Sequence, residues 1–306
     1  MYFTGFADEA GDSIETQIKA TVALGWKNIE SRSINHVNIT DIGEKEFEYV
    51  CEKLAESKVN INCFGSAIAN WSKDPRDEAG FQENLASLKR AIPRMHRLGT
   101  KYLRGMSFKI VKDVEPDSPE IEKLVFEKLS LLVKICEEGD ILYLHENCMN
   151  YGGLSHNHTL RLLEKMHSPN FKLVFDTGNP VGSDNHIGKP PYKKQSSWEF
   201  YTNVKEFIDY VHIKDCKFIK DTDQIFPELE FTFPGEGHGN VRKIVRDLLE
   251  NGYDSGFSIE PHLSVVYHEQ SDKPVELIRY ENYVTYGRKF MDLFEEERKE
   301  VEGKSE

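Results

Sequence analysis

Short apolar runs alternate with longer amphipathic segments along the chain of 306 residues. The runs have the length and composition of buried strands, and the longer segments repeat their apolar residues with the period of a helix. We predict eight strands, at residues 2–6, 27–31, 59–64, 101–106, 141–146, 172–176, 210–215 and 256–260. The main helices are predicted at residues 14–24, 44–57, 83–98, 119–138, 159–166, 198–208, 241–250 and 278–298.

Eight strand–helix units in about 300 residues predict an α/β fold, a single (β/α)8 TIM barrel over residues 1–306. A doubly wound open sheet is the structural alternative. It is disfavoured because no glycine-rich phosphate loop follows the first predicted strand. The charged stretch at about 299–306 is predicted to be a flexible C-terminal tail.

Each of the last four predicted strands ends, or nearly ends, in a residue that can bind a metal. These residues are Glu146, Asp176, His212 and Glu260. Taken singly, each is explained more simply as a loop cap or a hydrogen-bond partner. Together, at matching depth in successive barrel strands, they would place three carboxylates within a few ångströms, which is unfavourable without a cation. Three carboxylates and one imidazole suit one divalent ion, Mn²⁺, Zn²⁺, Co²⁺ or Mg²⁺.

The sequence contexts of these four residues, HENC, FDTGNP, HIKD and SIEPH, resemble those of the xylose-isomerase-like barrel superfamily. The GEG turn at residues 235–237 resembles a turn common in that group. The resemblance extends from residue 2 to about residue 290. It implies a barrel fold, one divalent metal on the four ligands, and a sugar isomerase or epimerase activity. In the ketose 3-epimerases of the group the two metal-bound glutamates also transfer the proton, so the resemblance extends that role to Glu146 and Glu260.

Three positions depart from the ketose 3-epimerase pattern. Gly152 replaces a second glutamate, Asn179 replaces a histidine, and Phe218 replaces an arginine. These changes argue against a plain free-ketose 3-epimerase and leave the metal ligands intact. Endonuclease IV needs the same histidine and an Asp-x-His, which is absent from residues 213–240. A phosphodiesterase-type nuclease is therefore disfavoured.

Further residues are expected around the metal. Lys214 should share the inward face of its strand with His212, where it polarises a carbonyl or forms a salt bridge with a ligand carboxylate. The expected substrate contacts are His145, Asn147, Asn179, Glu236, His262, Arg32 and Trp71, with His186 as an additional loop residue. For the loop residues among them, a solvated position is the plainer alternative.

The predicted reaction is proton transfer next to the carbonyl of a sugar or polyol ketone, through an enediolate, giving isomerisation or epimerisation. Loss of a β-substituent from the same enediolate would give a dehydratase or lyase acting on a keto-sugar, keto-glycoside or inosose. The metal ligands do not separate these outcomes. A non-catalytic barrel that binds metal and sugar is the alternative of another class.

The composition of the chain limits which binding partners and which cellular compartment we expect. The formal net charge of -13 disfavours nucleic acid as a partner. The five cysteines include no CxxC pair, and neither a leader pattern nor an apolar run near 18 residues is visible. We expect a cytoplasmic protein without a membrane span, and the sequence is compatible with a homo-oligomer.

Overall fold

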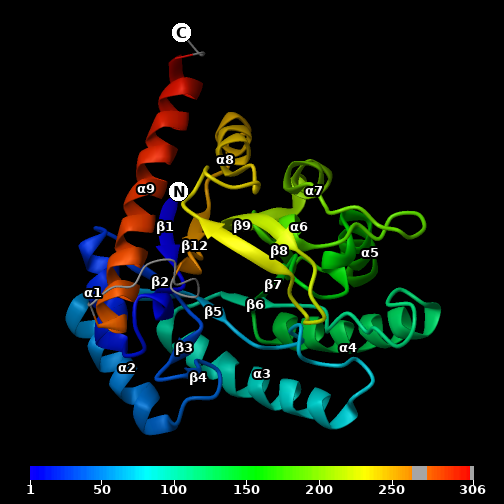
Figure 1. Ribbon diagram of the computed structural model, residues 1–306. Coiled ribbons are helices and arrows are strands. Elements are labelled where there is room, and N and C mark those ends of the chain that lie inside the picture. The colour runs from blue at the N-terminus through cyan, green and yellow to red at the C-terminus, as the bar shows by residue number, and fades with distance from the viewer. Residues whose placement is uncertain (264–273, 304–306) are drawn as a thin grey trace.

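The computed structural model describes residues 1–263 and 274–303. Its centre is a barrel of eight parallel strands (Figure 1). The strands are β1 (Tyr2–Gly5), β2 (Asn28–Ser31), β5 (Asn60–Gly65), β6 (Tyr102–Gly105), β7 (Leu142–Glu146), β8 (Phe171–Asp176), β9 (Ile208–Ile213) and β12 (Gly256–Ile259). They are hydrogen-bonded in the order β1-β12-β9-β8-β7-β6-β5-β2. A parallel bridge between Phe6, just after β1, and Glu30 of β2 joins the two end strands and nearly closes the barrel.

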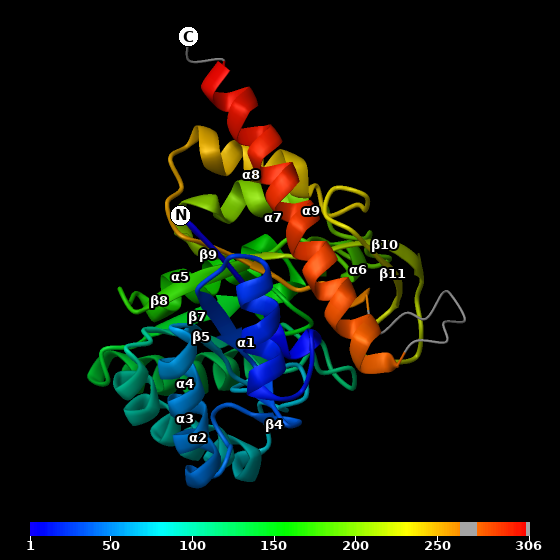
Figure 2. The same cartoon turned by 90° about the vertical axis from the view of Figure 1, so that its left-hand side faces the viewer.

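Helices surround the barrel, which confirms the predicted TIM-barrel fold (Figures 1 and 2). The main helices are α1 (Ile14–Ala23), α2 (Glu44–Ser57), α3 (Glu78–Leu98), α4 (Pro119–Glu138), α5 (His156–Met166), α7 (Ser197–Val204), α8 (Val241–Glu250) and α9 (Val275–Gly303). The bounds of α2, α4 and α8 coincide with the predicted ones. Helix α3 begins earlier than predicted because the Asp77 side chain caps it, accepting a hydrogen bond from the Gly80 amide.

The C-terminal helix is longer than the sequence pattern indicates. Helix α9 continues to Gly303, so residues 299–303 are helical where a flexible tail is predicted. Residues 304–306 lie outside the described part of the chain. None of the described helices is both long and apolar enough to cross a membrane.

Side chains along the barrel strands alternate between the interior and the helix layer, as the strand geometry requires. Cys63, Leu144, Val174 and Tyr210 pack together as one small buried cluster. Residues of the opposite parity, such as Tyr143, belong to the larger core. Because Glu146 shares the face of Leu144, it points into the barrel at the carboxyl end of its strand.

The seventh predicted strand ends earlier than expected and continues into an unpredicted hairpin. Strands β10 (Asp215–Lys220) and β11 (Glu228–Thr232) pair antiparallel outside the barrel. The buried Asp215 carboxylate accepts hydrogen bonds from the amides of Gly235, Gly237 and Gly239. A Cβ atom on Gly237 would lie 2.3 Å from Asp215 Oδ1, so only glycine allows this approach. The GEG turn is thereby tied to the end of β9. The remaining short elements are β3 (Ser33–Ile34), β4 (Val37–Asn38), α6 (Asn179–Gly182) and the 3-10 helices η1 (Ala7–Glu9), η2 (Gly152–Leu154) and η3 (Lys205–Phe207).

Candidate metal centre

The four predicted ligands converge at the carboxyl end of the barrel. Glu146 and Asp176 end β7 and β8, His212 lies in β9, and Glu260 directly follows β12. One ligand atom from each side chain lies within 4.8 Å of the other three, and all four side chains are buried. The parallel register places Asp176 opposite His212, which brings two of the ligands to the same level.

The imidazole of His212 is oriented by a carboxylate that the sequence analysis did not identify. Its Nε2 atom lies 3.0 and 3.1 Å from the two carboxylate oxygens of Glu30, and the Ser258 hydroxyl donates a hydrogen bond of 2.6 Å to the same carboxylate. With Nε2–H donated to Glu30, Nδ1 is the ring nitrogen left to face a cation. This is the arrangement in which metal-binding histidines are usually held.

The Nδ1 atom of His212 faces the three other ligands. It is buried and makes no hydrogen bond. It lies 3.6 Å from Glu146 Oε1, 3.8 Å from Glu260 Oε2 and 4.0 Å from Asp176 Oδ2. Ligand atoms held about 2.0–2.2 Å from one ion lie about 3–3.5 Å apart, so a small inward movement would complete the set. Glu146, Asp176, His212 and Glu260 therefore fit a divalent cation.

The charge balance around these residues also fits a cation. Six buried carboxylates surround the centre: Asp8, Glu9, Glu30, Glu146, Asp176 and Glu260. The Lys and Arg side chains in contact with them from inside the barrel are Arg32, Arg104 and Lys214. The six carboxylates exceed these three cations by three charges, which is costly in a buried site. The raised pKa values of His212 and His262, about 10 and about 9, place a proton on each imidazole that offsets part of the excess, and a divalent cation would take over that role at His212.

Two cationic side chains keep the glutamate ligands ionised. Burial raises the pKa of Glu146, but the Arg104 guanidinium, 2.9 Å from Oε2, outweighs burial and lowers that pKa to about 2. In the same way Lys214, 3.0 Å from Glu260 Oε2, holds the pKa of Glu260 well below its usual range against the effect of burial. Both glutamates are thus in the form that binds a cation.

The pKa values of the other two candidate ligands, Asp176 and His212, are shifted by burial and by their charged neighbours. Burial, together with the carboxylates of Glu260 and Glu146, raises the pKa of Asp176 to about 7. Burial lowers the pKa of His212, but the carboxylates of Glu30 and Glu146 outweigh it and raise that pKa to about 10. A bound cation would take the place of the proton between His212 and the carboxylates.

Lys214 lies at the edge of the centre with its ammonium group between two ligands. Its Nζ atom is 3.0 Å from Asp176 Oδ2 and 3.0 Å from Glu260 Oε2. Of the two roles considered for it, the salt bridge with ligand carboxylates is therefore present. The inward position beside His212 that the strand alternation predicts is also observed, since both side chains are buried with the ligands.

Three of the expected substrate contacts lie beside the ligands. Asn179 donates a hydrogen bond of 3.0 Å from Nδ2 to Glu146 Oε1. His262 Nε2 and Arg32 Nη1 both lie 3.2 Å from Glu260 Oε1. Arg32 and His262 also contact the buried Glu9 carboxylate. These side chains border the metal centre and hold its two glutamates in position.

The sequence matches the family model described as xylose isomerase-like TIM barrel over residues 18–280. The chain belongs to this family. None of the curated proteins matches the sequence.

Solved structures show the same fold at low sequence identity. The IOLI protein with a bound zinc atom shares 17% identity and a TM-score of 0.68, over 97% of this chain and 99% of that one. An L-ribulose 3-epimerase shares 16% identity and a TM-score of 0.67, over 99% and 97%. A xylose isomerase-like TIM barrel protein from Mycobacterium smegmatis in complex with magnesium shares 17% identity and a TM-score of 0.64, over 96% and 97%.

Within this xylose isomerase-like barrel, four of the expected substrate contacts lie elsewhere. His145 is on the opposite face of β7, where its Nε2 lies 2.9 Å from the Ser107 hydroxyl. The Asn147 side chain bonds the backbone of Asp176 and so positions that ligand. Glu236 is exposed and pairs with Lys289. Trp71 lines a cavity beside the centre. We leave His145 and Glu236 out of the site proposed below.

The departures from the ketose 3-epimerase pattern have structural counterparts in this family member. A Cβ atom on Gly152 would lie 2.3 Å from His145 Cε1, so the His145 ring fills the space that a side chain at 152 would need. Phe218 lies on the external hairpin, where the Lys194 ammonium is 4.7 Å from its ring centre. Neither position therefore supplies a polar group to the centre.

Sequence reasoning missed several residues of the centre, above all Glu30 and Arg104. Both lie near the carboxyl ends of short apolar strands, β2 and β6, which is the signal that identified the four ligands. The same signal is therefore present in the first half of the barrel. The buried Asp8 and Glu9, which bind Arg32, follow β1 in the same way.

Proposed function

We propose that this protein is a divalent-metal-dependent sugar isomerase or epimerase that transfers a proton next to a carbonyl group. The observation that carries the proposal is the buried Nδ1 atom of His212, which makes no hydrogen bond and faces Glu146, Asp176 and Glu260. Glu30 holds the ring in that orientation. The similar fold of a zinc-bound protein, a magnesium-bound protein and an L-ribulose 3-epimerase supports the proposal.

The residues of the centre have distinct roles in the proposed reaction. Glu146, Asp176, His212 and Glu260 would hold the cation, which would act as a Lewis acid toward the carbonyl and an adjacent hydroxyl of a sugar or polyol ketone. One of Glu146 and Glu260 removes the proton from the carbon beside the carbonyl, and the other returns a proton. Return to the opposite face gives an epimer, and return to the neighbouring carbon gives an isomer.

Basic side chains stabilise the negative charge that develops on the substrate oxygens. The Lys214 ammonium and the Arg104 guanidinium lie beside Glu260 and Glu146, at the points where the proton leaves and returns. Asn179, His262 and Arg32 are assigned to orienting the two glutamates and the substrate hydroxyl groups. Because these groups are buried and mutually bonded, little reorganisation is needed when charge develops.

The first test is elemental analysis of the purified protein beside the variant Glu260→Gln. We expect about one equivalent of Mn, Zn, Co or Mg in the wild type and a reduced content in the variant, which loses a ligand charge. The exposed Glu236 provides a matched control, and Glu236→Gln should keep the wild-type content. No metal after reconstitution would contradict the proposal, and two or three equivalents would favour hydrolysis of phosphate esters.

The second test measures incorporation of solvent deuterium into a panel of ketoses and keto-glycosides. The metal-loaded wild type should label the carbon next to the carbonyl, and Glu146→Gln and Glu260→Gln should each lower that rate by about 10²–10⁴-fold. Loss of a β-substituent from the substrate would identify a dehydratase or lyase. Saturable sugar binding without any exchange would identify a non-catalytic barrel and overturn the proposed activity.

A further inference from the structure

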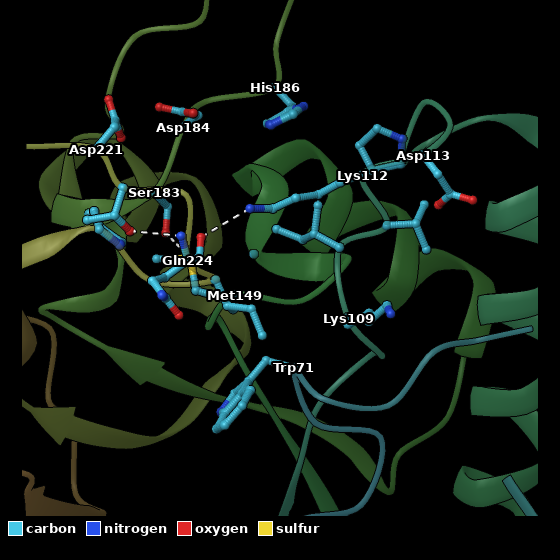
Figure 3. Close-up of a pocket in the computed structure, with 18 of the residues that line it drawn as sticks. Trp71, Lys109, Lys112, Asp113, Met149, Ser183, Asp184, His186, Asp221 and Gln224 are labelled. Carbon is cyan, nitrogen blue, oxygen red and sulfur yellow. Dashed lines mark hydrogen bonds between the residues drawn. The ribbon is translucent and has the colours of Figure 1, made fainter. Parts of the chain in front are cut away.

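A cavity of about 800 Å³ lies among the loops on the carboxyl-terminal face of the barrel (Figure 3). It is lined by the loops that follow β5, β6, β7 and β8 and by the turn of the β10–β11 hairpin. The side chains of Trp71 and Met149 lie at one end, and Asp184, His186 and Asp221 lie at the other (Figure 3). None of the four candidate ligands lines it.

The cavity adjoins the metal centre through its apolar end. Met149 follows the ligand Glu146 in the same loop, and it packs with Cys148, Met106 and Trp71 in one cluster. Met106 in turn follows Arg104, whose guanidinium bonds Glu146. The Ser183 hydroxyl, in the cavity wall, donates to the backbone oxygen of Asn179. The cavity wall therefore includes residues three positions after the candidate ligand Glu146 and four positions after Asn179.

The three lysines of the cavity wall, and the aspartates Asp113, Asp184 and Asp221, are paired with one another or with neighbours. Lys194 bonds Asp184 at 2.8 Å and Asp221 at 2.5 Å. The Asp113 carboxylate is 2.6 Å from Arg76, just outside the wall. Lys109 forms an ion pair with Asp74. Lys112 donates a hydrogen bond to the backbone oxygen of Gln224. Without a cluster of unpaired basic groups, the wall does not favour a phosphate or a carboxylate.

The uncharged groups of the wall suit a sugar ring. The Trp71 indole is half-buried and packs edge-on against Phe226 of the hairpin turn, with ring centres 5.1 Å apart. An aromatic surface beside paired polar groups provides both an apolar platform and hydrogen-bonding partners, the combination found in sites for small polar ligands. A volume of about 800 Å³ is in the upper part of the ~300–1,000 Å³ range of ligand pockets and exceeds what one ring needs.

We propose that this cavity binds the second, non-reacting ring of a neutral glycoside, whose keto-sugar ring lies at the metal centre. This inference rests on the proposed function and narrows its substrate class from free ketoses to keto-glycosides of at least two rings. It agrees with the absence, at positions 152, 179 and 218, of the residues that the free-ketose 3-epimerases carry. Trp71 is then the specificity-determining residue for the second ring.

Binding can be measured without turnover through the fluorescence of Trp71. The chain has three tryptophans, and of these only Trp71 lines the cavity. Maltose, cellobiose, sucrose and trehalose are titrated beside glucose and fructose. We expect at least one disaccharide to give a saturable change at a concentration about tenfold lower than any monosaccharide. Trp71→Phe should abolish the change, and Trp198→Phe, which alters a residue on α7 outside the cavity, should keep it.

Turnover is then compared for two substrates of the metal-loaded enzyme. One is the 3-keto derivative of the disaccharide that binds best, and the other is methyl 3-keto-glucoside. For the wild type, kcat/KM for deuterium exchange should be about tenfold higher with the keto-disaccharide than with methyl 3-keto-glucoside. The difference should lie in a lower KM for the disaccharide, with similar kcat values. Trp71→Ala should remove that preference with kcat retained, whereas Trp71→Phe should keep most of it. Circular dichroism verifies that the variants are folded.

The failure of this inference differs from the failure of the proposed function. If exchange occurs but no disaccharide changes the fluorescence, and the wild type and Trp71→Ala show the same ratio of kcat/KM values for the two substrates, the second-ring site is wrong and the proposed function stands. If a disaccharide gives the saturable signal but no substrate exchanges, the cavity assignment stands and the proposed chemistry is wrong.

Discussion

The carboxylate of Glu30 holds the imidazole of His212, with Oε2 3.0 Å from Nε2, inside a barrel where neither side chain reaches solvent. Glu30 comes from the second strand of the barrel and His212 from the seventh in the chain order of the barrel strands. The pair decides which imidazole nitrogen faces the three other candidate ligands. The candidate metal centre therefore includes a residue that is not itself one of the four candidate ligands.

Replacing Glu30 by glutamine should weaken metal binding about 10–100-fold. Glutamine keeps the size of the side chain but removes the negative charge that fixes the tautomer of His212 and raises its basicity. The measurement is the dissociation constant of Mn²⁺ or Zn²⁺ from chelator competition. Glu56→Gln, at an exposed site on α2, is the matched control and should leave that constant unchanged. Unaltered binding in Glu30→Gln would remove Glu30 from the centre.

Replacing Arg104 by methionine should destabilise the metal-free protein by about 3–5 kcal/mol. The change removes the partner of Glu146 and leaves a buried carboxylate without its cation. Urea unfolding of the metal-free protein measures the loss. Arg97→Met, which breaks an exposed pair with Glu48 on the surface, should change the unfolding free energy little. Equal losses of unfolding free energy in the two variants would show that the buried pair contributes no more to stability than the exposed pair.

Alanine at position 152 should destabilise the fold by about 1–3 kcal/mol. A methyl group there would lie 2.3 Å from the buried His145 ring, which would have to move against Ser107 and Phe171. Thermal unfolding measures the effect. Gly303→Ala is the control, because no heavy atom lies within 4 Å of a Cβ built at that position. If Gly152→Ala is as stable as this control, the His145 ring can move aside at little cost in free energy.

Acidification should destabilise the protein through His158. Burial lowers the pKa of this histidine, whose Nδ1 lies 2.7 Å from the Ser155 hydroxyl. Between about pH 6.5 and its lower folded-state pKa, the unfolded chain binds a proton that the folded chain does not, so stability falls as the pH falls. His158 therefore contributes less to the free energy of unfolding at about pH 5 than at about pH 7, and the difference in that free energy between the wild type and His158→Asn should decrease over this range. The exposed His36→Asn is the control, and a decrease of the same size for that variant would contradict the assignment to His158.

Much of the fold and of the metal centre follows from local patterns in the sequence. The periods of apolar residues place the eight barrel strands and give the bounds of α2, α4 and α8, because burial on one face dictates the spacing of apolar side chains along a strand or helix. The positions of Glu146, Asp176, His212 and Glu260 at strand ends predict that they meet, since parallel barrel strands end at one face. Each of these features follows from the order of residues along the chain.

Other features depend on which strands become neighbours and on what fills the space between them. The pairing of Glu30 with His212 and of Arg104 with Glu146 joins residues from different strands, and strand alternation specifies a side chain's face but not its partner. The same holds for His145, which fills the space at Gly152, and for the loops that enclose the cavity at Trp71. The sequence by itself determined the barrel and its four candidate ligands. Only the tertiary structure decided how those candidate ligands are held and where the cavity at Trp71 lies, because both depend on packing between distant segments.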